Sequence, residues 1–283
     1  MRNALSKEKF DIIVLAGQSN ASGFGVGPVS EEYVPDRRIL LMENDAIPYY
    51  TEPEEGSPYK YIMKFMNPTP RNTVRIADEV LADRGKVSSL AITFAEQYAR
   101  TFLDSERKVL IIDSACGGTG FTCPAWGVGN PLHNRMMDMV SLALSCNPEN
   151  RIVAFLWHQG EHDVVENEEK GFEPEALYQS HKANLVAMQN DFYTKFDCKS
   201  APFITAGFVT DWYQSHKVGA DAVMKAMRES AEEAGGRFLD VSDLKSNNQV
   251  LDNNDVIHFS RESQHIMGQR FFEAYLDVVK ESR

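Results

Sequence analysis

A serine near the start of this 283-residue chain has the surroundings of a nucleophile. The segment Asp11–Ala16, DIIVLA, is an apolar run typical of a buried strand, and GQSN (17–20) follows it directly. In an open parallel sheet, ligands bind beyond the carboxyl ends of the strands. A strand that stops at Gly17 would deliver the hydroxyl of Ser19 to that rim, so Ser19 is our candidate nucleophile.

A nucleophilic serine needs a general base, and the base needs an acid that orients it. Two acidic residues precede a histidine by three positions, in the pairs Asp255/His258 and Glu262/His265. Glu262 and His265 fall within a predicted helix, where we expect a solvated helix face. Asp255 and His258 fall in a polar loop, where the carboxylate can bind its own histidine and leave Nε2 free to accept a proton. Spacing alone leaves both a catalytic pair and a structural turn open.

Negative charge that develops on a substrate oxygen needs hydrogen-bond donors. Gly117 and Gly118 follow a second apolar run, KVLIIDSA (108–115), and glycines let backbone N–H groups approach a substrate. The amide of Ser19 is another candidate donor. So is the side-chain NH₂ of Gln159, which follows the run RIVAFLWH (151–158). For the glycine pair alone, a plain tight turn is the alternative.

A different chemistry is suggested by HQGEH (158–162), which has the H-x-x-E-H order of a zinc peptidase motif. That motif requires a helix with both histidines on one face. This segment instead follows a strand-like run and contains Gly160, which is unfavourable in a helix. We therefore predict no metal and no other cofactor, and expect Glu161, His162 and Asp163 to be polar loop residues near the pocket.

The elements that must position these residues alternate between strands and helices. Short apolar runs predict strands at 11–16, 37–42, 108–115, 151–158, 202–209 and 237–241. Longer amphipathic patterns predict helices at 92–103, 133–145, 174–196, 217–234 and 260–281. The alternation predicts an α/β fold, a three-layer α/β/α sandwich with a doubly wound parallel sheet, in one domain over residues 1–283. Residues 43–73, rich in Tyr, Pro and Glu, are expected to form a long irregular insert.

The composition limits the partners and the location that we expect. A formal net charge of −12 argues against nucleic-acid and anionic-membrane partners, because both need a basic face. No apolar run approaches the roughly 18 residues that span a bilayer. The start, MRNALSKEKFD, lacks the apolar core of a signal peptide, so we expect a cytoplasmic protein unless a leader has been removed.

Four short blocks, in order along the chain, carry a family resemblance. They are GQSNASG (17–23), GGT (117–119) followed by Trp126, W-x-Q-G-E-x-D (157–163) and D-x-x-H-F (255–259). Together they resemble the SGNH hydrolases, and within these the sialate O-acetylesterase-like enzymes of carbohydrate esterase family 6. The resemblance implies a flavodoxin-like sandwich with a metal-free serine esterase site, and favours Asp255 and His258 as partners of Ser19. In part of that family the glutamate of QGE is the proposed acid partner, so Glu161 is the alternative to Asp255.

Three positions depart from the usual pattern of the resembled family. Gln159 stands where most SGNH hydrolases have Asn. The carbohydrate-active subgroup shares this change, so the resemblance retains Gln159 as an oxyanion donor beside Ser19, Gly117 and Gly118. His162 stands where Ser or Asn is commoner, and Trp126 lies further beyond GGT than usual. Both bear on substrate fit, and both are candidate substrate-binding residues.

We therefore expect a serine esterase that removes acetyl or another small acyl group from a carbohydrate, either a small molecule or an oligosaccharide. Two alternatives stay open. A lipid or thioester acyl hydrolase would use the same site, and would be favoured if residues 43–73 closed over a long apolar groove. A catalytically silent carbohydrate-binding module would keep the fold without the reaction.

Overall fold

The computed structural model describes residues 5–281 apart from residues 58, 60, 68, 83–84 and 172. The main sheet of this part of the chain has seven strands in the order β11-β10-β9-β1-β8-β2-β5. They are β1 (Lys9–Gly17), β2 (Ile39–Asn44), β5 (Asn72–Ile76), β8 (Arg107–Asp113), β9 (Arg151–His158), β10 (Phe203–Ala206) and β11 (Arg237–Leu239). β5 pairs antiparallel with β2, and all other neighbours pair in parallel. Each of the six predicted strands is therefore present.

Five consecutive strands of the sheet have the flavodoxin-like order. In the sheet they run β8-β1-β9-β10-β11, which is 2-1-3-4-5 when these strands are counted along the chain. β2 and β5 extend the sheet beyond β8. In this topology ligands bind where the strand order reverses, outside the carboxyl ends of β1 and β9. Gly17 and His158 pair at that point, so the predicted fold class is confirmed and the rim of interest lies beside Ser19.

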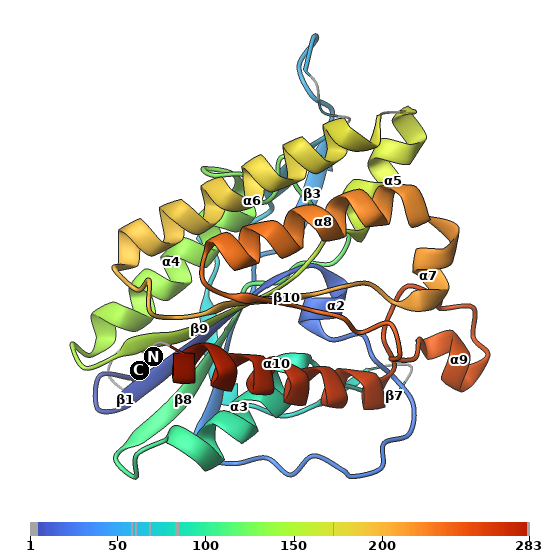
Figure 1. Cartoon of the computed structure of the whole chain (residues 1–283). Coiled ribbons are helices and arrows are strands. Elements are labelled where there is room, and N and C mark those ends of the chain that lie inside the picture. The colour runs from blue at the N-terminus through green and yellow to red at the C-terminus, as the bar shows by residue number, and fades with distance from the viewer. Residues whose placement is uncertain are drawn as a thin grey trace.

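Helices cover both faces of the sheet, which explains why its central strands contain long apolar runs. α3 (Leu90–Phe102) and α10 (Arg261–Glu281) lie on one face, and α4 (Pro131–Cys146), α6 (Pro174–Phe196) and α8 (Lys217–Glu233) lie on the other (Figure 1). Every residue of β1 from Phe10 to Ala16 is at most 1% exposed. The charged residue in this run, Asp11, accepts hydrogen bonds from Arg107 at 2.8 Å and Arg151 at 2.6 Å. The sheet is thus a rigid base for the loops at its edge.

Residues 43–73 differ from the expected irregular insert. β3 (Pro48–Thr51) and β4 (Ile62–Phe65) form an antiparallel pair, and β5 joins the main sheet. These strands are only four or five residues long, and Tyr- and Pro-rich stretches conceal their alternation. The remaining short elements are α2 (Ser19–Ser22), β6 (Val80–Ala82), β7 (Gly85–Val87), α7 (Thr210–Ser215) and α9 (Asn247–Leu251).

The expectation that Glu161, His162 and Asp163 are loop residues is also wrong. They form the first turn of α5 (Glu161–Lys170), which starts almost directly after β9. Gly160 makes this junction possible because it has φ 156°, and a Cβ there would lie 2.5 Å from the ring of Phe208. The polar side chains after β9 are consequently held by a helix.

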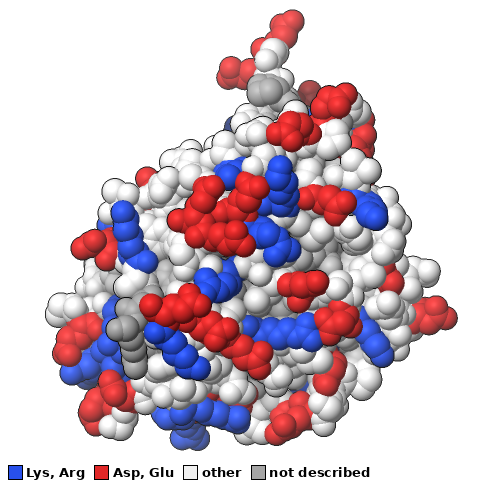
Figure 2. All heavy atoms as spheres, in the orientation of Figure 1, with Lys and Arg blue, Asp and Glu red and all other residues white. Residues whose placement is uncertain are grey.

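The face of the molecule in Figure 2 mixes acidic and basic side chains over α6, α8 and α10. Lys182 on α6 pairs with Glu229 and Glu233 on α8 at 2.7 and 2.8 Å. Arg270 on α10 pairs with Asp243 at 2.6 Å. Exposed pairs of this kind contribute little to stability because solvent screens the charges. None of the described helices combines the length and the apolar character needed to cross a membrane.

Candidate active site

Ser19 occupies the rim position that the sequence predicts. β1 ends at Gly17, whose φ is 126°, and a Cβ on this residue would lie 2.1 Å from the carbonyl oxygen of His158. The amide of Gln18 donates to that same oxygen at 2.9 Å. Only glycine therefore lets β1 turn this close to β9. Ser19 then begins α2 with its side chain largely buried.

The glycine loop after β8 lies against Ser19. The amide of Cys116 donates to the carbonyl of Gly17 at 3.0 Å, which ties this loop to the end of β1. A Cβ on Gly117 would lie 3.5 Å from the Cβ of Ser19. No hydrogen bond within the described part of the chain uses the amide N–H of Ser19 or of Gly117. Gly118 has φ 67°, and a Cβ on this residue would have no described heavy atom within 4 Å. These N–H groups are thus available as candidate donors to a substrate oxygen.

Asp255 and His258 form the predicted pair. Nδ1 of His258 lies 2.8 Å from Oδ1 and 3.0 Å from Oδ2 of Asp255. Asn247, from α9, donates to Oδ2 of Asp255 at 2.9 Å, and the ring of Phe24 stacks on that of His258 with centroids 5.0 Å apart. With Nδ1 as donor to the carboxylate, Nε2 is the nitrogen that can accept a proton.

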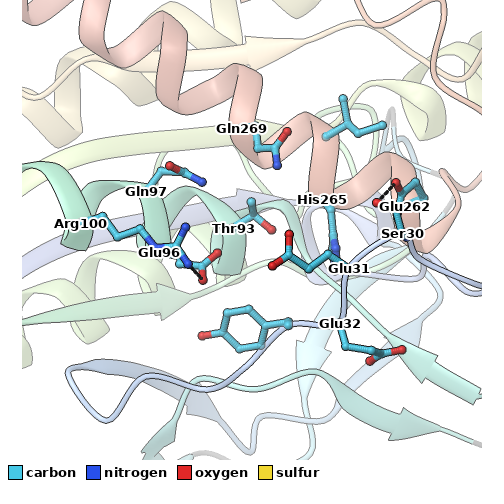
Figure 3. Close-up of a pocket in the computed structure, with 12 residues that line it drawn as sticks. Ser30, Glu31, Glu32, Thr93, Glu96, Gln97, Arg100, Glu262, His265 and Gln269 are labelled. Atoms are coloured by element: carbon cyan, nitrogen blue, oxygen red, sulfur yellow. Dashed lines mark hydrogen bonds and ion pairs between the residues drawn. The ribbon is translucent and has the colours of Figure 1, made fainter.

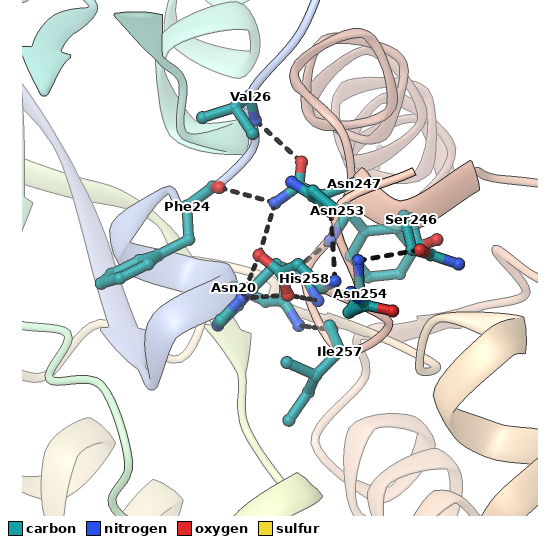
Figure 4. Close-up of polar contacts among 12 residues, drawn as sticks. Asn20, Phe24, Val26, Ser246, Asn247, Asn253, Asn254, Ile257 and His258 are labelled. Carbon is teal, nitrogen blue, oxygen red and sulfur yellow. Dashed lines mark hydrogen bonds and ion pairs between the residues drawn. The ribbon is translucent and has the colours of Figure 1, made fainter. Parts of the chain in front are cut away.

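Asn20 joins the two distant segments that carry Ser19 and His258. Its Nδ2 donates to the carbonyl of Ile257 at 3.1 Å, and its Oδ1 accepts from the amide of Phe259 at 3.1 Å. The residue after Ser19 therefore holds both neighbours of His258, more than 230 positions further along the chain (Figure 4). This pair of bonds brings the serine segment and the histidine loop together.

Glu161, the alternative acid, supports Asn20. Its Oε1 accepts from Nδ2 of Asn20 at 2.7 Å, and the same oxygen lies 3.9 Å from Nδ1 of the buried His158. Asp255 binds the ring of His258 directly, so the geometry favours Asp255 as its orienting acid. Glu161 instead fixes the amide that clamps the histidine loop.

Gln159 belongs to a buried polar network centred on Asp163. Its Nε2 lies 3.3 Å from Oδ2 of Asp163, which also receives Nδ1 of His181 at 2.9 Å. Oδ1 of Asp163 accepts from the amide and hydroxyl of Thr122 at 2.9 and 2.7 Å. Burial by itself would raise the pKa of Asp163, but the hydrogen bonds from His181 and Thr122 outweigh it and hold the pKa at about 2. Asp163 therefore ties Gln159 to the loop that also carries Gly117.

The zinc alternative loses its geometric basis in this arrangement. His158 ends a strand, and its Nε2 lies 3.0 Å from the carbonyl of Gly207. His162 lies on α5, and its Nε2 lies 3.0 Å from the hydroxyl of Tyr61. The two imidazoles thus lie on different elements and have separate partners. Among the described residues, no group of three or more His, Cys, Asp and Glu side chains could hold a metal ion.

Trp126 does not serve as the predicted substrate platform. Its ring is 0% exposed and packs edge-to-face on Trp157 with centroids 5.2 Å apart, while its Nε1 donates to Thr119 at 2.9 Å. A fully covered indole has no surface for a sugar, so this prediction is wrong. Trp126 instead stabilises the GGT loop, because its indole N–H donates a hydrogen bond to Thr119 in that loop.

Sequence reasoning missed several residues that shape this site. Asn20 had a signal, since it belongs to the GQSN block, but its clamping role depends on the distant loop. Asn247, His181 and Tyr61 had none, because each reaches its partner only through the packing of separate elements. Contacts of this kind leave no spacing pattern in a single sequence.

The Glu262/His265 pair lies in another hollow and is not a second dyad (Figure 3). This hollow has a volume of about 160 Å³ and lies between α3, α10 and residues 30–33. None of the residues that line it is one of the predicted catalytic residues. Nε2 of His265 contacts Glu79 at 2.8 Å, whereas Glu262 accepts from the amide and hydroxyl of Ser30 at 2.9 and 2.7 Å. The expected solvated helix face is therefore a set of contacts that fasten α10 to neighbouring loops.

The fold is the one that the resemblance to SGNH hydrolases predicts, and Ser19 lies at the rim of its sheet. The chain matches, over residues 9–277, the family described as carbohydrate esterase, sialic acid-specific acetylesterase. It belongs to this family.

The individual relatives share 25% or less of their sequence with this chain. A protein of Escherichia coli (strain K12), named a probable 9-O-acetyl-N-acetylneuraminic acid deacetylase, is 25% identical over 195 residues. That match spans 58% of this chain and 57% of the relative, so it covers little more than half of the curated protein. The crystal structure of NanS has a TM-score of 0.70 at 20% identity, covering 97% of this chain and 99% of that one. A protein from Arabidopsis thaliana has a TM-score of 0.65 at 18% identity, covering 94% and 98%. These structural likenesses show the fold.

Proposed function

We propose that this protein is a serine esterase that hydrolyses acetyl, or another small acyl, from hydroxyl groups of carbohydrates. The observation that carries the proposal is the clamp of Asn20 on both neighbours of His258, because it holds the segment that contains Ser19 against the loop that contains an acid-oriented imidazole. Membership of the carbohydrate esterase family supports the substrate class. The open amides of Ser19 and Gly117 support acyl transfer.

In the first half of the proposed reaction, Oγ of Ser19 attacks the ester carbonyl while Nε2 of His258 takes the hydroxyl proton. Asp255 holds the imidazole in the required tautomer and stabilises the imidazolium that forms. The amides of Ser19, Gly117 and Gly118 and the Nε2 of Gln159 are the candidate donors to the tetrahedral oxyanion. When the intermediate collapses, the sugar oxygen leaves with the proton from His258, and the acyl group stays on Ser19.

In the second half, water attacks the acyl-serine and His258 accepts its proton. Collapse of the second intermediate expels Oγ of Ser19, which recovers a proton from His258, and releases the carboxylic acid. Both halves need the same three side chains, so His258 alternates between base and acid. Each oxyanion donor is expected to supply about 2.7–4 kcal/mol of transition-state stabilisation.

An O-acetylated sialic acid is the first sugar ester to test. The family description and the name of the Escherichia coli relative both point to this class of substrate. A small acyl group is consistent with a Ser19 side chain that is largely buried and lies against the glycine loop. A series of esters from acetyl to octanoyl measures the acyl preference, and the lipid alternative would require the longer chains to react faster.

The assignment is tested by comparing Ser19→Ala with Ser22→Ala, a matched change on the same short helix. We expect Ser19→Ala to lower kcat for ethyl acetate and for 9-O-acetyl-N-acetylneuraminic acid by at least about 10⁴-fold, and Ser22→Ala to leave both nearly unchanged. Labelling with a fluorophosphonate should depend on Ser19 in the same way. Comparable rates for Ser19→Ala and the natural protein would reject the esterase, and unlabelled natural protein would favour the silent binding module.

A further inference from the structure

The β3–β4 hairpin turns one of its faces toward the body of the protein. In its antiparallel register Tyr50 lies opposite Met63, and alternation places Tyr61 and Phe65 on the same face as Met63. Met63 is buried, and Arg135 of α4 lies over the ring of Phe65 at 5.5 Å. The face that carries Tyr50 and Tyr61 is therefore the inner face of the hairpin.

Tyr50 is unusual on this inner face because it is 46% exposed. Its ring meets that of Tyr61 edge-to-face, with centroids 4.8 Å apart. Partial burial, with the nearby thiols of Cys116 and Cys123 as the lesser causes, raises the pKa of Tyr50 to about 12. Tyr50 is therefore a neutral, half-exposed aromatic side chain that packs on Tyr61.

Tyr61 connects this aromatic pair to the segment after β9. Its hydroxyl lies 3.0 Å from Nε2 of His162, and the amide of His162 reaches Oε1 of Gln18 at 3.3 Å. Gln18 precedes Ser19 in the chain. Glu161, next to His162, holds the Asn20 clamp. The hairpin thus reaches the nucleophile segment through one tyrosine–histidine contact.

We propose that Tyr50, Tyr61 and His162 form the subsite for the sugar ring of the substrate, an inference that rests on the esterase function proposed above. Tyrosine joins an apolar ring, which suits the C–H face of a pyranose, to a polar tip that can bond its hydroxyls. The phenol and the imidazole hold each other in place, so their hydrogen-bonding groups are pre-organised. Polar groups fixed around an aromatic surface are the usual composition of a small-molecule site.

The test separates recognition of the sugar from the chemical step. It compares Tyr50→Ala with Tyr49→Ala, a change on the same strand whose side chain points to the outer face of the hairpin. One substrate is 9-O-acetyl-N-acetylneuraminic acid, and the other is ethyl acetate, which has no ring to recognise. Released acetate is followed by titration, because a chromogenic aryl ester would itself offer a ring to Tyr50.

We expect Tyr50→Ala to raise KM for the sugar ester about 10-fold with little change in kcat, and to leave kcat/KM for ethyl acetate within about twofold. His162→Gln should raise the same KM by less, and Tyr49→Ala should change neither substrate. Equal losses on both esters, an unchanged KM for the sugar ester, or an equal effect of Tyr49→Ala would each overturn the subsite. So would a natural protein that hydrolyses ethyl acetate as efficiently as the sugar ester. These results differ from failure of the esterase itself, in which Ser19→Ala would retain activity on ethyl acetate.

Discussion

Two aspartate–histidine pairs in this molecule share the same hydrogen bond but lie in opposite surroundings. Nδ1 of His258 lies 2.8 Å from Asp255, and Nδ1 of His181 lies 2.9 Å from Asp163. The side chains of the first pair are 16% and 15% exposed, whereas both side chains of the second are 0% exposed. Identical donor and acceptor atoms therefore occur once at the rim of the sheet and once in the interior.

The second ring nitrogen shows what this difference means. Nε2 of His258 belongs to a partly exposed ring on the loop that Asn20 clamps beside Ser19. Nε2 of His181 is buried and has no hydrogen-bond partner among the described residues. A substrate can exchange a proton only with the first. The comparison teaches that access to Nε2, and not the hydrogen bond to the carboxylate, separates a candidate catalytic pair from a structural one.

Among changes to the two aspartates of these pairs, the larger effect should come from Asp255→Asn. An amide in place of the carboxylate cannot hold the Nδ1–H tautomer of His258, so we expect kcat for ethyl acetate to fall about 10⁴-fold without loss of the fold. Asp252→Asn is the matched control, since Asp252 is exposed in the same loop and its left-handed conformation suits asparagine. A loss smaller than about 10-fold would make the Asp255/His258 pair structural and direct attention to Glu161.

The Asp163→Asn change should act mainly on stability. Asp163 accepts four hydrogen bonds, one each from Gln159 and His181 and two from Thr122. In asparagine the NH₂ group replaces one carboxylate oxygen, so at least one of these N–H or O–H donors would lose its acceptor. We expect unfolding in urea at pH 7 to be easier by about 1–3 kcal/mol, and kcat to fall by no more than about 10-fold as Gln159 loses its support. A loss of activity equal to that of Asp255→Asn would break the comparison between the two pairs.

The same variant has a defined pH dependence. Because the folded pKa of Asp163 is about 2, below its ordinary value of about 3.9, its ionised form contributes stability that is present above pH 4 and is lost as pH falls toward 2. The stability difference between the natural protein and Asp163→Asn should therefore shrink between pH 4 and pH 2. Asp138→Asn, at an exposed position on α4, should show no such trend. A gap that stays constant would mean that Asp163 is not held ionised by its partners.

Much of the fold could be predicted because its signals are local. β1, β8 and β9 are unbroken apolar runs, and the bounds 174–196 predicted for the long helix are those of α6. The β3–β4 pair was missed because its strands span four residues each and gain their register from pairing with one another. α5 was missed because a single glycine, Gly160, replaces the loop that normally separates a strand from a helix.

The candidate site was predictable to the extent that its partners are close in sequence or lie at strand ends. Asp255 and His258 are three positions apart, and Ser19 and Gly117 each follow a central strand. The other pair, Asp163 and His181, is separated by 18 positions and forms only because α5 packs on α6. Trp126 was misjudged because a tryptophan gives no sign in the sequence of which side of a loop it occupies.

The smallest effect should come from His265→Gln, which tests a third acid–histidine contact. Nε2 of His265 lies 2.8 Å from Glu79, and Arg261 also binds Glu79 at 2.9 Å. His265 lines the hollow between α3 and α10, and Ser19 is not among the residues of that lining. Because Arg261 remains, we expect unfolding in urea to become easier by only about 1 kcal/mol and kcat for ethyl acetate to change less than twofold. The matched contrast is His258→Gln, which should abolish nearly all activity with little effect on stability. A large loss of activity in His265→Gln would mean that a histidine outside the predicted site is needed for the reaction. Access of the substrate to Nε2 of His258 would then not be what separates catalytic from structural histidines.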